Sequence, residues 1–325
     1  MSIKIYGKGD IDLLSHFNEG DFEGYELHLG LLKGNENKSL EKLPPYINIA
    51  AIHNPTRIKI KKNIFKFDLN CGGKIEEKSW EDLKKTIHIA QEIGAEKVII
   101  HGASHNPQKN NKKESIEEFV NKIKKWDKLI SFENDALWRG NFPVRPLLAT
   151  VNDFTMFKKV YGNGLKTTFD LEHSILTCCF EEFLKHNVNY KKTRMSWKEF
   201  NLDYQTFIAQ NRKDIQIKIT HYIEDFIKLL GKSINHLHVN GSDFTNFTYK
   251  EKGVTPLRGE HLDISENLNG IKDRNDYGKL AHLLTTFSPA ALVMVLELMP
   301  DEYFRKRLLV SKNRLFKKLA IKERG

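Results

Sequence analysis

Histidine and carboxylate side chains occur at the ends of six apolar segments of this chain. The segments AAIHNP, VIIHGA, ISFEN, TTFDLEH, INHLHVN and VMVLELMP supply, in that order, His53, His101, Glu133, Asp170 with His173, His238 and Glu297. The later segment RGEHLDI adds His261. Imidazole and carboxylate groups together are the ligands that divalent transition metals accept in proteins. The sequence therefore predicts a divalent metal site.

The cost of burying so many ionisable groups also favours a metal. Each buried charge destabilises the fold unless a partner compensates it. One to three divalent ions would compensate these groups, and Mn, Co, Mg, Zn and Fe are all candidates. Any single histidine could instead be an ordinary hydrogen-bonded residue, but that explanation accounts poorly for matching groups at six successive segments.

Strand alternation places these polar side chains on one face. Successive side chains of a strand point to opposite faces of its sheet. Glu133 is therefore opposite Phe132, and His238 is opposite Leu237. In a barrel, such apolar side chains meet the surrounding helices, and the polar ones converge at the carboxyl-terminal mouth, where barrel active sites form.

The elements that must position these residues alternate between short apolar strands and amphipathic helices. This alternation predicts an α/β fold, and eight strands favour a closed (β/α)8 TIM barrel. The clearest predicted helix is Ser79–Gly94, with Ser79 as its N-cap, and Ser115–Lys128 and Ile219–Leu230 are two more. The predicted strands are Ile3–Tyr6, Tyr25–Leu29, Ile47–Ile52, Lys97–Ile100, Leu129–Glu133, Lys166–Asp170, Ile234–Val239 and Leu292–Leu298.

The segment Phe180–Lys218, between the sixth and seventh strands, is too long for an ordinary barrel loop. We predict a polar, helical insertion there, over about residues 180–218, which could form a lid over the barrel mouth. The sequence has no internal repeat at a fixed period and no low-complexity linker. A single domain over residues 1–325 is expected.

The composition is typical of a soluble globular protein, with 40% hydrophobic and 29% charged residues. The longest apolar stretches, such as Ala290–Leu298, are too short to cross a bilayer. The N-terminal segment is too polar for a secretory signal, and three cysteines are too few for a disulfide scaffold or a four-cysteine zinc site. We therefore expect a cytoplasmic location and no membrane partner.

The formal net charge is +10, and the basic helix predicted over residues 301–325 contains nine basic and three acidic residues. A solvated helix face is the favoured interpretation of that charge. A surface for nucleic acid is the alternative.

Taken together, the motifs resemble the xylose-isomerase-like TIM-barrel superfamily, which includes sugar and sugar-phosphate isomerases and epimerases and endonuclease IV. The resemblance covers about residues 1–300 apart from the insertion. The isomerase and epimerase branch implies one metal held by four residues, of which two glutamates are also the catalytic acid and base of a metal-stabilised enediolate. The matching residues are Glu133, Asp170, His238 and Glu297, and the two glutamates are Glu133 and Glu297.

The resemblance also implies that His173 contacts substrate, and His101 and His53 are further substrate-binding candidates when only one metal is bound. Glu26, which shares a face of the second strand with His28 in YELHLG, is another candidate, and a hydrogen-bonded interior pair is the alternative interpretation of these two residues. Arg258 is a candidate for binding a substrate phosphate.

The endonuclease IV branch implies three zinc ions and nine ligands. Eight positions match, namely His53, His101, Glu133, Asp170, His173, His238, His261 and Glu297. The ninth ligand of that branch is an Asp, but this chain has Gly259, and Asp263 is the nearest substitute.

The function predicted first is therefore a metal-dependent isomerase or epimerase acting on a sugar or sugar phosphate. The alternatives are a multinuclear phosphodiesterase acting on abasic DNA and a multinuclear iron oxygenase acting on a peptide. A binding barrel without activity is disfavoured because both candidate acid/base glutamates are present. The expected partner is a small carbohydrate, with nucleic acid as the alternative, and assembly into a homo-oligomer stays open.

Overall fold

The structure is a computed structural model of the chain. It describes residues 2–101, 103–106, 108–109, 111–126, 128–137, 145–187, 196–249, 256–258, 261–262, 264, 267–268, 271–272, 274–287, 291–298 and 303–320.

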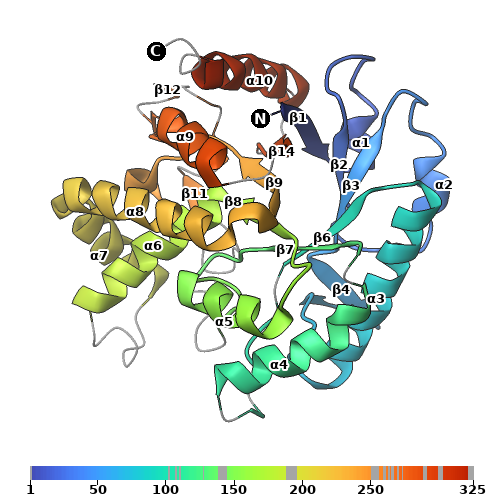
Figure 1. Ribbon diagram of the computed structural model, residues 1–325, viewed down its shortest axis with the longest axis horizontal. Helices are drawn as coiled ribbons and strands as arrows, with labels where there is room; N and C mark the ends of the chain where they lie inside the picture. The colour runs from blue at the N-terminus through green and yellow to red at the C-terminus, as the bar shows by residue number, and fades with distance from the viewer. Residues whose placement is uncertain are drawn as a thin grey trace.

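Within these residues, eight parallel strands form a closed barrel surrounded by helices (Figure 1). The predicted (β/α)8 TIM barrel is therefore confirmed. Around the barrel the strand order is β1-β14-β9-β8-β7-β6-β3-β2, closed by the pairing of β1 with β2. The strands are β1 (Ser2–Gly9), β2 (Tyr25–His28), β3 (Ile49–His53), β6 (Lys97–His101), β7 (Ile130–Glu133), β8 (Thr167–Asp170), β9 (Ile234–Val239) and β14 (Ala291–Leu296).

Each of these strands overlaps one of the eight predicted from the sequence, and most of their ends differ by one or two residues. The exception is β1, which runs three residues beyond the predicted end at Tyr6. The register of the strands brings the polar rim together, because His101 pairs with Glu133 and Asp170 pairs with His238. Residues that are far apart in the chain therefore lie at the same height of the barrel.

The helices cover the outside of the barrel (Figure 1). Among the described residues, short 3-10 turns occur at η1 (Lys124–Trp126), η4 (Gly231–Ser233) and η5 (Phe244–Asn246). Small two-stranded sheets outside the barrel pair β4 (Arg57–Ile60) with β5 (Asn63–Lys66), β10 (Thr248–Tyr249) with β11 (Pro256–Arg258), and β12 (Asn267–Leu268) with β13 (Ile271–Lys272). The helices are α1 (Ile11–Leu14), α2 (Glu36–Leu40), α3 (Gly73–Glu92), α4 (Lys112–Ile123), α5 (Val151–Tyr161), α6 (Leu171–His186), α7 (Trp197–Gln210), α8 (Arg212–Leu230), α9 (Tyr277–Phe287) and α10 (Phe304–Ala320).

The main core lies between the strands and these helices. Phe132 of β7 packs its ring against Phe157 and Tyr161 of α5, and Phe169 of β8 packs against Phe226 of α8. All five side chains are buried. Burying each such ring stabilises the fold by roughly 1.5–3 kcal/mol, which fixes the outward face of each strand and leaves its other face to the barrel interior.

Ser79 is not the N-cap of its helix, which corrects the sequence prediction. The helix α3 begins at Gly73, and Ser79 lies in its second turn with its hydroxyl donating to the carbonyl of Ile75 at 2.8 Å and accepting from the amide of Asp68 at 3.0 Å. The sequence Gly72-Gly73, with φ of 79° and 65°, allows the chain to turn into the helix earlier. The first turns are polar, so the apolar period revealed only the later part of the helix.

Between β8 and β9 the chain forms α6, α7 and α8, so the described part of the segment predicted as an insertion is helical (Figure 1). The helix α7 begins with a capping box between Ser196 and Glu199. Its rings Phe200, Tyr204 and Phe207 all pack against Phe183 of α6. Residues 188–195 of this segment lie outside the described residues.

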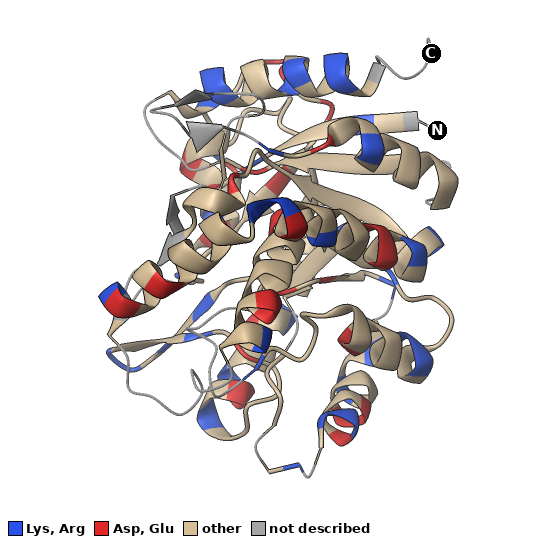
Figure 2. Cartoon of the chain, turned by 90° about the vertical axis from the view of Figure 1, so that its left-hand side faces the viewer, with Lys and Arg blue, Asp and Glu red and all other residues tan. Residues whose placement is uncertain are grey.

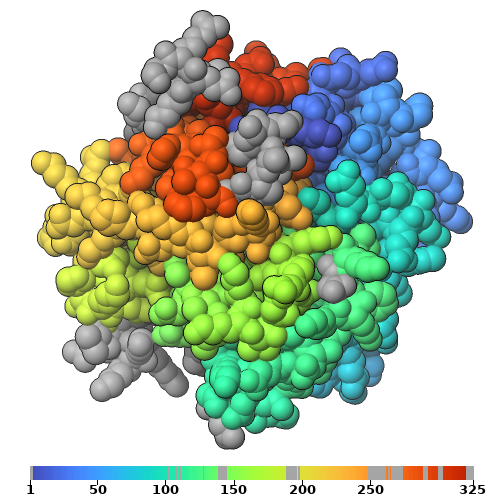
Figure 3. Space-filling view, viewed as in Figure 1, coloured from blue at the N-terminus to red at the C-terminus, as the bar shows by residue number. Residues whose placement is uncertain are grey.

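The basic helix α10 lies against the N-terminal part of the barrel (Figures 2 and 3). Arg305 forms two hydrogen bonds with the carboxylate of Asp21, at 2.6 and 2.9 Å. Lys312 lies 4.9 Å from the ring centre of Phe22, and Lys318 lies 4.6 Å from that of Tyr277. Several charges of this helix therefore contact the chain itself. Among the described helices, none has a stretch long and apolar enough to cross a membrane.

Candidate metal centre

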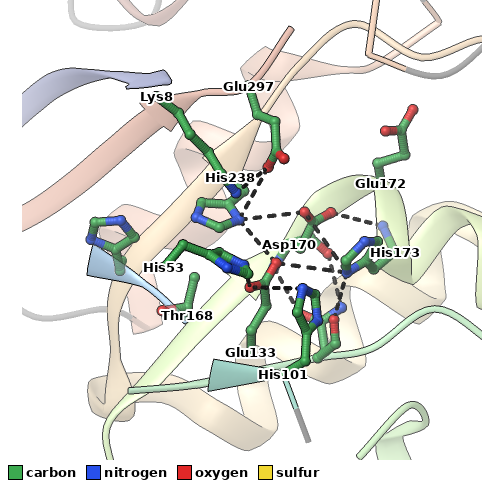
Figure 4. A network of polar contacts seen from close by, with 12 residues as sticks. Lys8, His53, His101, Glu133, Thr168, Asp170, Glu172, His173, His238 and Glu297 are labelled. Carbon is green, nitrogen blue, oxygen red and sulfur yellow. Dashed lines mark hydrogen bonds and ion pairs between the residues drawn. The ribbon is translucent and has the colours of Figure 1, made fainter. Parts of the chain in front are cut away.

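The ring nitrogen Nδ1 of His238 is the point on which the other three predicted metal ligands converge (Figure 4). It is 2.9 Å from Glu133 Oε1, 3.5 Å from Asp170 Oδ2 and 3.4 Å from Glu297 Oε2. Glu133, Asp170 and His238 are almost fully buried, whereas the Glu297 side chain is 21% exposed at the mouth. The structure thus brings together, at one point, the imidazole and three carboxylates that the sequence analysis proposed as a ligand set.

Asp170 has one oxygen available for a cation. It is the N-cap of α6, where Oδ1 accepts a hydrogen bond from the amide of His173 at 2.8 Å. Its Oδ2 is buried and has no hydrogen-bond partner among the described residues. A buried carboxylate oxygen without a donor is costly, and a metal ion would compensate it. The ligand atoms of Asp170, His238 and Glu297 lie within 4.8 Å of one another. The residues therefore fit a divalent ion.

A second group of possible ligands adjoins the first. Glu133 directs its other oxygen, Oε2, to His53 Nε2 at 3.0 Å and to His101 Nε2 at 3.7 Å. The ligand atoms of these three residues also lie within 4.8 Å of one another. Glu133 consequently faces His238 with one oxygen and both His53 and His101 with the other, so it could contribute one oxygen to each of two metal sites.

His173 also contributes to this rim. Its Nδ1 donates to the backbone carbonyl of Asn134 at 2.7 Å and lies 3.8 Å from Asp170 Oδ2. Because Nδ1 carries the proton in that hydrogen bond, Nε2 is the nitrogen that can accept from substrate or bind a metal.

His261 belongs to none of the ligand groups that the described residues form. Its amide donates to Glu172 Oε1 at 3.1 Å, and Asn240 Nδ2 lies 2.9 Å from its Nδ1. Its predicted role as a ligand in a multinuclear site therefore stays a prediction. Arg258 belongs to β11, but its side chain, like Gly259 and Asp263, lies outside the described residues.

Glu26 lies in the barrel interior, and its predicted role as a substrate contact stays a prediction. Its side chain is fully buried, and its Oε2 accepts hydrogen bonds from His236 Nε2 at 2.8 Å and His238 Nε2 at 2.9 Å. The period of two correctly placed Glu26 in the barrel interior but could not show its depth. Glu26 supports His238 from behind.

Lys8 was missed by the sequence analysis. Its side chain is 6% exposed, and its Nζ lies 2.9 Å from Glu297 Oε2 and 3.1 Å from Glu26 Oε1. The sequence contains a signal for Lys8, because it follows Tyr6 by two residues and therefore points to the same inward face of the strand. It was overlooked because the predicted first strand ended at Tyr6.

Burial and the charges around the site shift the pKa values of its residues. Burial disfavours the charged form of His238, but Glu26 and Glu133 raise its pKa well above the ordinary 6.5. Burial also disfavours the Glu133 carboxylate, but His101 and His238 hold its pKa well below the ordinary 4.5. Burial lowers the pKa of His101 to about 4, so this ring is neutral at neutral pH.

No protein-family model matches the chain, and no curated protein matches it. Solved structures of other proteins do match the chain. A D-tagatose 3-epimerase-like protein aligns over 99% of this chain and 98% of its own with 16% identity and a TM-score of 0.54. A xylose isomerase domain protein from Alicyclobacillus acidocaldarius aligns over 100% of both chains with 10% identity and a TM-score of 0.56. The chain has the xylose-isomerase-like TIM-barrel fold.

A putative xylose isomerase from Rhodospirillum rubrum is similar as well, with 9% identity, a TM-score of 0.53 and coverage of 97% of this chain and 99% of its own. At such identities the likeness shows the fold alone. It confirms the barrel fold that the motifs implied. The xylose-isomerase-like barrel places the carboxyl ends of its strands at one mouth, where the ligand groups described above lie.

Proposed function

We propose that the protein is a divalent-metal-dependent isomerase or epimerase acting on a sugar or sugar phosphate. The observation that carries this proposal is the position of His238 Nδ1, within 3.5 Å of one oxygen from each of Glu133, Asp170 and Glu297. Four such groups, with their carboxylates ionised, form a hard, mixed nitrogen and oxygen ligand set. The likeness in fold to a D-tagatose 3-epimerase-like protein supports the same class of reaction.

Glu133, Asp170, His238 and Glu297 would hold the metal. When bound, a divalent cation acidifies the carbon-bound hydrogen between neighbouring sugar oxygens and stabilises the negative charge that forms when it leaves. The partly exposed carboxylate of Glu297, at the mouth, is the group best placed to reach substrate from solvent.

Glu133 and Glu297 reach the site from different directions, since β8 and β9 separate β7 from β14 in the barrel. One glutamate can therefore take a proton from one face of a substrate carbon while the other returns a proton to the opposite face. The neutral ring of His101 and the Nε2 of His173 can hydrogen-bond sugar hydroxyls at the rim. These residues orient the substrate, and the two glutamates move its proton.

This function can be tested by hydrogen exchange. Metal-loaded protein is incubated with a panel of ketoses and ketose phosphates in deuterium oxide, and proton NMR follows the hydrogen next to the carbonyl carbon. We expect exchange with at least one sugar, and a loss of about 100-fold or more in Glu297→Gln and in Glu133→Gln. The exposed Glu19→Gln is the matched control and should behave as wild type. Exchange that survives both substitutions would contradict the proposal.

One observation favours a second candidate, a multinuclear metal enzyme. Glu133 faces His238 with one oxygen and His53 with the other, so it could bridge two ions. A phosphodiesterase acting on abasic DNA would use such a centre. Such an enzyme would cut abasic DNA, and its affinity for the DNA would fall steeply as the salt concentration rises. An iron oxygenase would instead consume oxygen. Either result, without exchange of a sugar hydrogen, would favour this second candidate.

A further inference from the structure

The amino group of Lys8 is enclosed among carboxylates inside the barrel. Its Nζ is 2.9 Å from Glu297 Oε2 and 3.1 Å from Glu26 Oε1. Figure 4 shows Lys8 and Glu297 reaching the cluster beside His238, while His101 reaches it from the other side. Lysine is almost never buried unless it is paired, so the two carboxylates hold it as an ammonium group.

This ammonium group lies next to a further group of potential metal ligands. The ligand atoms of Glu26, His236 and His238 lie within 4.8 Å of one another. Each oxygen of Glu26 has a cationic or N–H neighbour, because Oε2 accepts from the two histidines and Oε1 forms an ion pair with Lys8 Nζ at 3.1 Å. Lys8 therefore supplies the positive charge that a metal ion would otherwise supply here.

The charges around Lys8 bear on how many divalent ions can bind beside it. The four carboxylates that contact His238 or Lys8 are those of Glu26, Glu133, Asp170 and Glu297; the first three are buried and Glu297 is 21% exposed. Lys8 and one divalent ion would leave a single negative charge among them. A second divalent ion among Glu26, His236 and His238 would add two positive charges beside the Lys8 ammonium group, which lies 3.1 Å from Glu26 Oε1. Repulsion between charges at such short distances is strong where water is largely excluded.

We propose that Lys8 is a fixed cation that limits the number of divalent ions this barrel binds. Its ammonium group stands between Glu26 and Glu297 in place of a further ion. Lys8 is thus a positioning residue that sets the metal content of the site. The inference rests on the proposed metal site, but it does not depend on a sugar being the substrate.

The test compares the metal binding of wild type and Lys8→Met, which replaces the ammonium by an apolar chain of similar length. Both proteins are stripped of metal and equilibrated with Mn²⁺ and, separately, with Zn²⁺. Elemental analysis counts the bound ions, and competition with a chelator gives their Kd. We expect Lys8→Met to bind one further ion per chain, or the same ion about tenfold or more tightly. Lys8→Arg keeps the charge and should match wild type.

Equal or weaker metal binding by Lys8→Met would overturn the proposal, because Lys8 would then order Glu297 without competing with a metal. If Lys8→Met is too unstable to purify, Lys8→Gln keeps a hydrogen-bond donor without the charge. Its metal-induced rise in Tm should exceed that of wild type, and an equal or smaller rise overturns the proposal. The ion count of the wild type tests the proposed function, whereas the difference between variant and wild type tests Lys8, so the two failures are distinguishable.

Discussion

His238 presents one ring nitrogen to the proposed metal and the other to a carboxylate. Its Nδ1 faces Glu133, Asp170 and Glu297, and its Nε2 lies 2.9 Å from Glu26 Oε2. An imidazole that donates its second N–H to a carboxylate is held in one orientation and one tautomer, and it becomes a stronger metal ligand. Glu26 therefore belongs to the metal centre although it cannot touch the metal in this arrangement.

Replacing Glu26 should weaken metal binding. Glu26→Gln removes the charge that orients His238 and leaves Lys8 with Glu297 as its remaining carboxylate partner. We expect the Kd for Mn²⁺ to rise by roughly 10–100-fold, measured by competition with a chelator. Glu19→Gln, on the exposed surface, controls for the loss of one carboxylate. An unchanged Kd would mean that Glu26 has no role in orienting His238.

The metal-free protein should be most stable in weakly acidic solution. The pKa of His238 is raised, so its contribution to stability is complete below 6.5 and is lost as the pH rises through the raised value. The pKa of Glu133 is lowered, so its contribution is present above 4.5 and is lost as the pH falls through the lowered value. Together, these two groups predict that the free energy of unfolding, measured as a function of pH, is greatest between pH 4.5 and pH 6.5.

Bound metal should change this pH dependence, because it must displace the proton from His238 Nδ1. We expect Mn²⁺ to raise Tm more at about pH 8 than at about pH 6, since fewer protons then compete. An increment that is the same at both pH values would show that the metal does not bind at His238.

At the scale of elements, the packing of α7 on α6 should stabilise the fold without touching the proposed site. Phe183 is 1% exposed and contacts the rings of Phe200, Tyr204 and Phe207. Phe183→Ala should lower the free energy of unfolding by about 3–5 kcal/mol, measured by urea denaturation. Phe316→Ala, at a side chain that is 40% exposed, should cost much less. Equal losses in both variants would show that α7 does not pack on α6 as described.

The elements also show how far the sequence could predict the site. Apolar runs bounded by polar residues identified the eight barrel strands, and the period of two placed Glu133 and His238 on the inward face. Neither signal reports depth within the barrel, so the sequence could not show that Glu26 lies behind His238, with its Oε2 2.9 Å from His238 Nε2. Neither shows where an apolar run continues through glycine, and so the extension of β1 through Gly7 to Lys8 was missed.

At the scale of the whole molecule, closure of the barrel turns scattered residues into one site. Parallel strands start at one end and finish at the other, so every strand end contributes to the same mouth. The first and last parts of the barrel sequence lie side by side (Figure 3). Arg305 of α10 pairs with Asp21 and so links the two parts. The basic helix α10 therefore helps to hold the C-terminal part of the chain against the N-terminal part.

The central claim is that His238, Glu133, Asp170 and Glu297 hold a divalent ion. The most direct test is anomalous X-ray diffraction from crystals of the protein loaded with Mn²⁺, since the anomalous signal locates the ion itself. The account predicts a peak at the centre of these four side chains, within about 2.0–2.3 Å of His238 Nδ1. A peak elsewhere in the barrel, or a fully loaded crystal without a peak beside His238, would contradict it.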